Sequence, residues 1–296
     1  MDTSKGERLQ VVLARFGVAS RRGVVSLIEE GKVIVNDAVV REKGFRVDMA
    51  RDKITVNGEA LPLSVSLEKR YFIFNKPKGV MTTMQDPNAE RIVADFFQDV
   101  SARLFPVGRL DRDTTGLLLM TNDGELAFRL THPKFGVTKR YRAVVDGAVT
   151  DEKLKRLEKG IVLEEGKTAP CKIEVEAKSS KETSLYVTLH EGKKRQIRRL
   201  FERVGHRVTE LERLNFGPLS LGDLRRGDKR ELTRNEVRQL EQAAGLKAPS
   251  KDSSELGVGS SETTDVKTFT PLRDMCFLIS PVGVIIMFSP MYVVVP

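Results

Sequence analysis

The chain has 296 residues, of which 40% are hydrophobic and 31% are charged, so its composition excludes a fibrous or wholly disordered protein. At about 100–200 residues per domain, this length predicts two domains. The net charge of +9 and the isoelectric point of about 9.5 favour a polyanionic partner, nucleic acid first. Composition alone leaves an anionic membrane open as a partner.

Cysteine and histidine spacing argues against a metal site. Cys171 and Cys276 stand far apart, and neither belongs to a CxxC or Cys/His pattern. The chain also has no GxGxxG or phosphate-binding loop, so we expect neither a metal nor a cofactor. Residues 1–6 contain no apolar run, so we expect no signal peptide and a cytoplasmic protein.

The first predicted domain spans residues 6–66. Apolar residues recur with helical spacing between Leu9 and Phe16, and Ser20 is placed to cap a second helix before Gly31 ends it. Short strands follow at 32–35, 38–40 and 54–56. Basic side chains cluster around the two helices, which by itself is typical of a solvated face.

The second predicted domain spans residues 69–246. Strands are expected at 71–74, 117–120, 140–145, 172–177 and 184–189, and helices at 151–159, 196–204 and 233–244. Because strands and helices do not alternate regularly, the fold class is α+β, with a mixed, mainly antiparallel sheet flanked by helices.

The composition changes over residues 247–296. Residues 251–264 are rich in Ser, Gly and Glu, which predicts a disordered linker. The apolar tail after it is interrupted by Pro281, Gly283 and Pro290 and has no basic flank, so we expect no membrane span. No role is assigned to this tail.

The most specific stretch is residues 105–124. It places Arg109, Asp111 and Asp113 in a loop just before a buried apolar strand, where Gly116 allows close approach of another backbone. A carboxylate at this position either caps a turn or acts chemically, and local pattern does not decide between the two.

Several motifs together carry a family resemblance. Residues 108–111 (Gly-Arg-Leu-Asp) and 115–118 (Thr-Gly-Leu-Leu) resemble the signature of RsuA/RluB-type ribosomal RNA pseudouridine synthases. Matching motifs occur in order at 75–79, 138–141 and 191–201. The first domain resembles the S4 RNA-binding domain through residues 8–15, 20–22 and 31–36. The resemblance covers about residues 7–246 and is closer to the RluB-like branch.

The resemblance implies a role for each matched residue. Asp111 would be the nucleophile that attacks the target uridine, and Arg198 would pair with it and keep it charged. Tyr141 would stack on the base and help remove the C5 proton. Ile197 would pack on the base, although a simple core role is equally open. Arg109 would support the loop or fill the space that the base leaves.

Further basic residues are candidates for RNA contacts, which would position the RNA without reading its sequence. They are Arg8, Arg21 and Arg22 in the first domain, and Lys76, Lys78, Lys139, Lys193, Lys194 and Arg195 in the second. The expected partner is ribosomal RNA or a pre-ribosomal particle, bound by a monomer.

The resemblance implies isomerisation of a uridine in ribosomal RNA, with 23S RNA favoured. Two alternatives remain: a synthase for 16S RNA, and a ribosome-assembly factor that binds RNA without turnover. A carboxylate pair of Asp111 and Asp113, as in glycosidases or metal-dependent nucleases, ranks low because side chains two residues apart need not converge.

Overall fold

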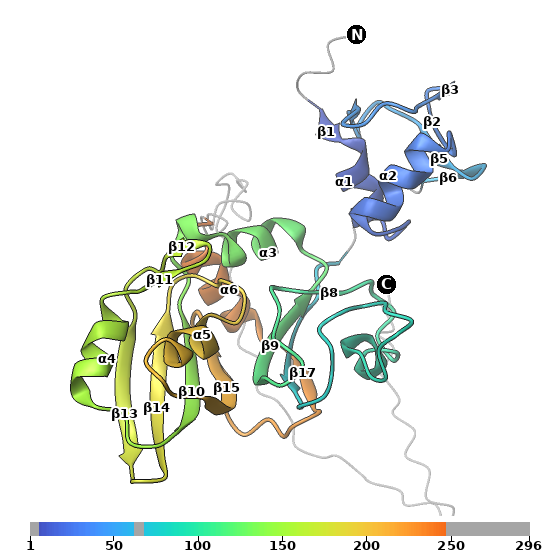
Figure 1. Ribbon diagram of the computed structural model, residues 1–296. Coiled ribbons are helices and arrows are strands. Elements are labelled where there is room, and N and C mark those ends of the chain that lie inside the picture. Colours follow the sequence, from blue (N-terminus) through green and yellow to red (C-terminus); the bar gives the residue numbers. More distant parts are fainter. Residues whose placement is uncertain (1–5, 62–67, 247–296) are drawn as a thin grey trace, which may run out of the picture. The chain divides into compact units, whose positions relative to one another are not determined.

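The structure is a computed structural model that describes residues 6–61 and 68–246. The N-terminal part is a pair of short helices with small antiparallel strands (Figure 1). Its elements are β1 (Glu7–Arg8), α1 (Leu9–Arg15), α2 (Arg21–Glu29), β2 (Val33–Val35), β3 (Ala38–Val39), β4 (Arg46–Val47), β5 (Ile54–Val56) and β6 (Glu59–Ala60).

Local sequence explains the N-terminal part well. Leu9 and Leu13 of α1 are fully buried, as helical spacing predicted. The Ser20 hydroxyl accepts a hydrogen bond of 3.0 Å from the Gly23 amide and so caps α2, as predicted. Asn36 and Asp37 form the turn between β2 and β3 with φ of 50° and 65°, a conformation that these residue types tolerate.

The second part is built on one large sheet. Its strands are β7 (Tyr71–Lys76), β8 (Phe105–Pro106), β9 (Thr115–Thr121), β10 (Lys139–Asp146), β13 (Lys172–Lys178), β14 (Glu182–Leu189), β15 (Val208–Phe216), β16 (Leu219–Ser220) and β17 (Lys229–Glu231); a separate hairpin joins β11 (Val162–Leu163) to β12 (Gly166–Lys167). Its helices are α3 (Gly124–Thr131), α4 (Asp151–Glu158), α5 (Gln196–Glu202) and α6 (Arg234–Ala243), with 3-10 turns η2 (Val93–Phe96) and η3 (Pro133–Phe135).

The sheet has the order β13-β14-β10-β15-β9-β7-β17, with β16 beside β15 and β8 beside β9. All pairs are antiparallel except β15 with β9. The prediction of a mixed, mainly antiparallel sheet with flanking helices is therefore confirmed. At the parallel pair, a Cβ on Gly116 would lie 2.3 Å from the Arg213 carbonyl oxygen, which confirms the predicted close backbone approach.

Alternate residues of β7 and β9 face two different cores. Ile73 and Leu117 pack with α3 and α6, whereas Phe74 and Leu118 pack with the segment around η2. Both strands are buried throughout, which explains their continuous apolar runs. A third cluster lies between β10, β14, β15 and the helices α4 and α5.

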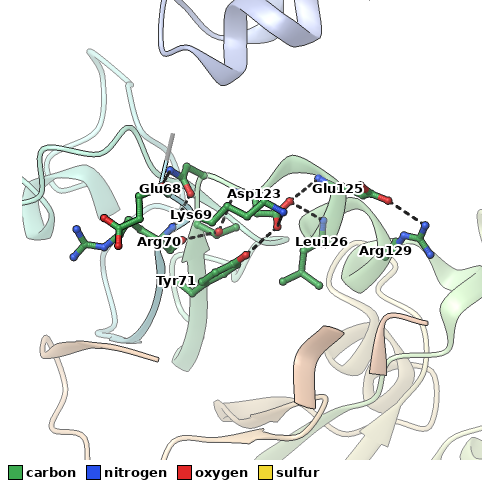
Figure 2. A network of polar contacts seen from close by, with 10 residues as sticks. Glu68, Lys69, Arg70, Tyr71, Asp123, Glu125, Leu126 and Arg129 are labelled. Carbon is green, nitrogen blue, oxygen red and sulfur yellow. Dashed lines mark hydrogen bonds and ion pairs between the residues drawn. The ribbon is translucent and has the colours of Figure 1, made fainter. Parts of the chain in front are cut away.

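The junction between β7 and α3 is closed by one carboxylate (Figure 2). Asp123 accepts hydrogen bonds from the amides of Glu125 and Leu126 at 3.1 and 3.2 Å and so caps α3. The same side chain accepts a bond of 2.9 Å from the Tyr71 hydroxyl and lies 2.8 Å from the Lys69 ammonium. Two elements that are distant in sequence are thereby joined at a buried point.

Some predictions fall outside this description. The linker and apolar tail expected over 247–296 lie beyond the described residues. Within residues 6–61 and 68–246, no helix is both long and apolar enough to cross a membrane. The domain limits 6–66 and 69–246 stay predictions.

Candidate active site

The loop between β8 and β9 presents Asp111 at the surface. Its neighbours Leu110 and Thr114 are buried, at 5% and 2% exposure, whereas the Asp111 side chain is 36% exposed. The Thr114 amide donates to the Asp111 carbonyl at 3.0 Å and closes a turn. The backbone is therefore anchored on both sides of a carboxylate that solvent and ligands can reach.

Residues from a distant loop hold the Asp111 loop in place. The Thr82 hydroxyl donates to the Leu110 carbonyl at 2.7 Å and accepts from the Leu110 amide at 3.3 Å. The Gly79 amide donates to the Arg112 carbonyl at 2.9 Å. Thr82 could not be predicted from the sequence, because no local pattern marks a threonine that bonds to a residue 28 positions along the chain.

Lys76 is a structural residue of this site, and its predicted role as a phosphate contact is wrong. The side chain is fully buried, and its ammonium donates to the carbonyls of Pro77 at 3.0 Å and Val80 at 2.7 Å, with that of Arg112 at 3.4 Å. Burial lowers the pKa of Lys76 to about 8, although the charges of Asp113 and Asp111 oppose this shift. Lys76 therefore ties the Asp111 loop to the loop after β7.

The cation beside the Asp111 carboxylate is Arg195. Its Nη1 lies 3.7 Å from Asp111 Oδ2, and both side chains are partly exposed. Arg198, which the resemblance paired with Asp111, instead donates to the carbonyls of Val208 at 2.9 Å and Asp113 at 3.4 Å. Burial, followed by the charge of Arg195, lowers the pKa of Arg198. In this structure Arg198 fixes the loop backbone and Arg195 faces the carboxylate.

Hydrogen bonds of the buried Gln196 side chain hold Arg195 at the start of α5. Arg195 has φ of 49°, and among the non-glycine residues described with positive φ it is the only one that is neither Asn nor Asp. The next residue, Gln196, is 3% exposed; it donates to Glu191 at 2.6 Å and accepts from the Lys193 amide at 3.1 Å. Strain of this kind persists only where the surroundings enforce it.

Tyr141 is the other aromatic candidate of the site. It lies on β10 and packs against both the α4–α5 core and the core that contains Leu110, the neighbour of Asp111. The pairing of β10 with β15 shifts register between Arg140 and Tyr141. Such an irregularity redirects a side chain relative to a regular strand. Tyr141 remains partly exposed.

Two further candidates for RNA contact are buried, and the predicted phosphate contact of Lys139 is wrong. Ile197 is 2% exposed and packs with Leu200 and Phe201, so of the two roles left open by the sequence the structure shows the core one. Lys139 is 8% exposed; its ammonium donates to the Val137 carbonyl at 3.1 Å and lies over the Phe216 ring. Burial, followed by the charge of Arg213, lowers the pKa of Lys139 to about 8.

The remaining basic candidates are accessible. Lys193 is partly exposed, and its ammonium donates to the carbonyls of Lys167 at 2.7 Å and Gly166 at 3.4 Å. The other candidates are more exposed; they are Arg8, Arg21, Arg22, Lys78, Arg109, Lys194 and Arg195. A cavity of about 240 Å³ lies beside the Asp111 loop, lined by residues that include Gly79, Met81 and Arg112.

Among residues 6–61 and 68–246, no group of three or more His, Cys, Asp or Glu side chains is arranged to hold a metal ion. Asp111 and Asp113 are the carboxylates of the loop, and Asp113 is the more exposed of the two. The chemistry that this site offers is that of an accessible carboxylate, Asp111, on an anchored loop and faced by a guanidinium.

Comparison with known proteins agrees with both parts. Residues 70–203 match the family described as RNA pseudouridylate synthase, and residues 7–54 match the S4 domain. The chain is 49% identical over 237 residues to ribosomal large subunit pseudouridine synthase B of Bacillus subtilis, covering 79% of this chain and 95% of that protein. The protein of the same name from Pseudomonas aeruginosa is 41% identical, covering 82% of this chain and 64% of that protein.

A solved structure gives the same answer for the fold. The crystal structure of a pseudouridylate synthase superimposes with a TM-score of 0.58 at 29% identity, over 79% of this chain and 99% of that one. The family assignment rests on both domain matches and on relatives that are covered over nearly their full length. The chain belongs to the RNA pseudouridine synthase family, as a member that carries an N-terminal S4 domain.

Proposed function

We propose that this enzyme isomerises one uridine of 23S ribosomal RNA to pseudouridine, with Asp111 as the nucleophile. The observation that carries the proposal is the Asp111 carboxylate itself, accessible on an anchored loop with the Arg195 guanidinium 3.7 Å away. The names of the Bacillus and Pseudomonas relatives favour the large subunit over the small one. We also propose that the enzyme acts in the cytoplasm, because its proposed substrate is ribosomal RNA.

The reaction needs a nucleophile but no external reagent. The Asp111 carboxylate adds to ribose C1′ or to the uracil ring, and the bond between N1 and C1′ breaks. The uracil turns in the site, C5 bonds to C1′, and the carboxylate is released. C5 loses a proton and N1 gains one, so the product is an isomer of the substrate.

The surrounding residues fit this sequence of steps. Arg195 places a positive charge beside the Asp111 carboxylate, while Arg198 and Lys76 hold the backbone that carries it. Tyr141, partly exposed on β10, would stack on the uracil and help to remove the C5 proton. Because a stacked base is inaccessible, the uridine must leave the RNA stack before it reaches Asp111.

The variant Asp111→Asn tests the proposal. It keeps the shape of the side chain and removes the nucleophilic charge, so pseudouridine formation should fall by at least about a thousandfold while RNA affinity is retained. The gene is deleted from the cells, and either the wild-type or the variant gene is supplied on a plasmid. Pseudouridines are then mapped on the 23S and 16S RNA of both strains. RNA binding is measured in parallel on the purified proteins.

The matched control is Asp113→Asn, two residues along the same loop, where the side chain is exposed and only the backbone carbonyl is used. It should keep most of the activity. Full pseudouridine formation by Asp111→Asn contradicts the mechanism. A site that depends on the enzyme in 16S RNA contradicts the large-subunit assignment. Binding without turnover by the wild type indicates an assembly factor.

A further inference from the structure

A second basic site lies at the far end of α5. A cavity of about 470 Å³ is lined by three cationic side chains, those of Arg156, Lys167 and Arg203, and by no acidic one. The rest of its lining is apolar or glycine: Gly160, Ile161, Val162 and Val204. A concave surface with convergent positive charge and an apolar floor is suited to an anion carried on a larger molecule.

The three cations are available to a ligand. Within residues 6–61 and 68–246, none of them lies within 4.0 Å of a carboxylate oxygen. All three are exposed, although they come from different elements: Arg156 from α4, Lys167 from β12 and Arg203 from the end of α5. Like charges that gather without counter-ions repel each other, so an anion between them is favourable.

The hairpin of β11 and β12, which supplies Lys167, is held by residues in and just before α5. Arg199 donates to the Glu165 carboxylate at 2.6 and 2.9 Å, and Lys193 donates to the carbonyl of Lys167 at 2.7 Å. Arg199 also holds the pKa of Glu165 below its usual range, so the one carboxylate paired on this hairpin is already neutralised by a cation. The hairpin of β11 and β12 therefore keeps Lys167 at the rim.

The floor of the cavity leaves no room for a side chain. Gly160 has φ of +79°, and a Cβ there would lie 2.3 Å from the Thr168 carbonyl oxygen. The Thr168 hydroxyl accepts from the Ile161 amide at 3.0 Å, and the backbones of the two residues are hydrogen-bonded as well. The concavity is thus fixed by backbone contacts.

The position of the cavity relates it to the catalytic loop. Arg195, which faces Asp111, precedes α5, and Arg203 follows it. Eight residue steps lie between them, and at a helical rise of 1.5 Å per residue this is about 12 Å along the axis. A few nucleotides of RNA span such a distance.

We propose that the pocket of Arg156, Lys167 and Arg203 binds backbone phosphates of the RNA substrate a few nucleotides from the target uridine. The identity of the ligand as substrate RNA rests on the proposed function. Phosphate contacts of this kind supply affinity and register but not sequence recognition. Free phosphate offers the same chemistry, and the experiment must separate the two sources.

The test is the triple variant Arg156→Gln, Lys167→Gln, Arg203→Gln, assayed with unmodified 23S RNA. Each lost phosphate contact reduces the salt slope of log K by about 0.7–0.9, so the slope of the triple variant should fall by about 2.1–2.7. Its Kd and KM should rise at least about fivefold at moderate salt, with kcat changed less than about twofold. Each single variant should show part of the effect.

The charge-matched control is Lys155→Gln, Lys181→Gln, Arg207→Gln, three exposed cations of the same domain that do not line the cavity. An equal change of slope in this control would show that only net charge matters and would overturn the proposal. Unchanged RNA affinity in the pocket variant overturns it too, even if calorimetry detects inorganic phosphate binding to wild type. RNA affinity is measured with the pocket variant combined with Asp111→Asn. The affinity result then does not depend on whether the proposed chemistry is correct. Urea unfolding verifies that the variants are folded.

Discussion

At the scale of single residues, the basic side chains of this family member divide into buried and accessible ones. Lys76 and Lys139 belong to motifs that the sequence linked to RNA, yet both ammonium groups donate to backbone carbonyls inside the protein. A lysine at the end of an apolar strand can point outward or fold back over the strand. The carbonyls that decide between these options come from loops whose paths the sequence does not reveal.

Lys76→Met should lower the free energy of unfolding by about 1–3 kcal/mol, because the carbonyls of Pro77 and Val80 lose their donor while buried. Activity should fall as well, since the same ammonium lies 3.4 Å from the carbonyl of Arg112, next to Asp111. Urea unfolding and pseudouridine formation measure the two effects. Lys78→Met, at an exposed position of the same motif, should change stability little. Weaker RNA binding by Lys76→Met at unchanged stability would restore the phosphate role.

The buried Lys76 also predicts a dependence of stability on alkaline pH. Burial lowers its pKa from the ordinary 10.5 to about 8. Between these values the unfolded chain holds a proton that the folded protein has released, so stability rises with pH in this window. The free energy of unfolding of wild type, relative to Lys76→Met, should therefore increase from pH 8 to 10.5. A difference that stays flat across this range would mean that Lys76 titrates normally.

At the scale of elements, the sequence predicted the strands with apolar runs but missed β15. That strand lies in the middle of the sheet, yet only Val208, Leu211, Arg213 and Phe216 of its residues are buried. The spacing between Val208 and Leu211 imitates a helix, and the charged residues between them hide the strand. Its place beside β9 depends on the approach to Gly116, a contact between segments far apart in the chain.

In the candidate site too, the sequence predicted what local motifs mark and missed contacts between distant segments. The motif predicted Asp111 and the helix after Arg195, because both are marked by local sequence. It paired Asp111 with Arg198, whereas the structure places the guanidinium of Arg195 there. Two features explain why Arg195 and not Arg198 faces Asp111. The backbone at Arg195 is left-handed, and the guanidinium of Arg198 already donates to the carbonyls of Val208 and Asp113. Neither the turn nor those carbonyls leave a local signal.

The junction of β7 and α3 gives a prediction at this scale (Figure 2). Asp123→Ala removes the cap of α3 and leaves the buried Tyr71 hydroxyl without its acceptor, so the free energy of unfolding should fall by about 2–4 kcal/mol. Asp123→Asn keeps one oxygen to accept from the amides of α3 and places its amide nitrogen beside the Tyr71 hydroxyl, which can accept from it, so this variant should cost clearly less. Urea unfolding of the three proteins provides the comparison. Equal losses in both variants would mean that the charge beside Lys69, not the hydrogen bonds, stabilises the junction.

At the scale of the whole molecule, some of the cations behind the net charge of +9 are accessible to RNA and others are buried and stabilise the fold. The S4 domain offers exposed arginines on short helices, and the pseudouridine synthase domain offers the site and its flanking cations. Buried Lys76, Lys139 and Arg198 count toward the net charge but serve the fold. The charge that attracts RNA is therefore smaller than composition suggests, and it is concentrated at identifiable positions.

The S4 arginines should set affinity rather than rate. Arg21→Gln with Arg22→Gln removes two exposed cations from the start of α2. If both contact phosphates, the salt slope of log K for 23S RNA should fall by about 1.4–1.8, and KM should rise while kcat changes little. Arg15→Gln is the control, because Arg15 is already paired with Glu7 at 3.0 Å and should contribute less. Filter binding over a range of salt concentrations gives the slopes. A loss of kcat at saturating RNA would contradict a docking role, since it would mean that these arginines act in the chemical step or in placing the uridine.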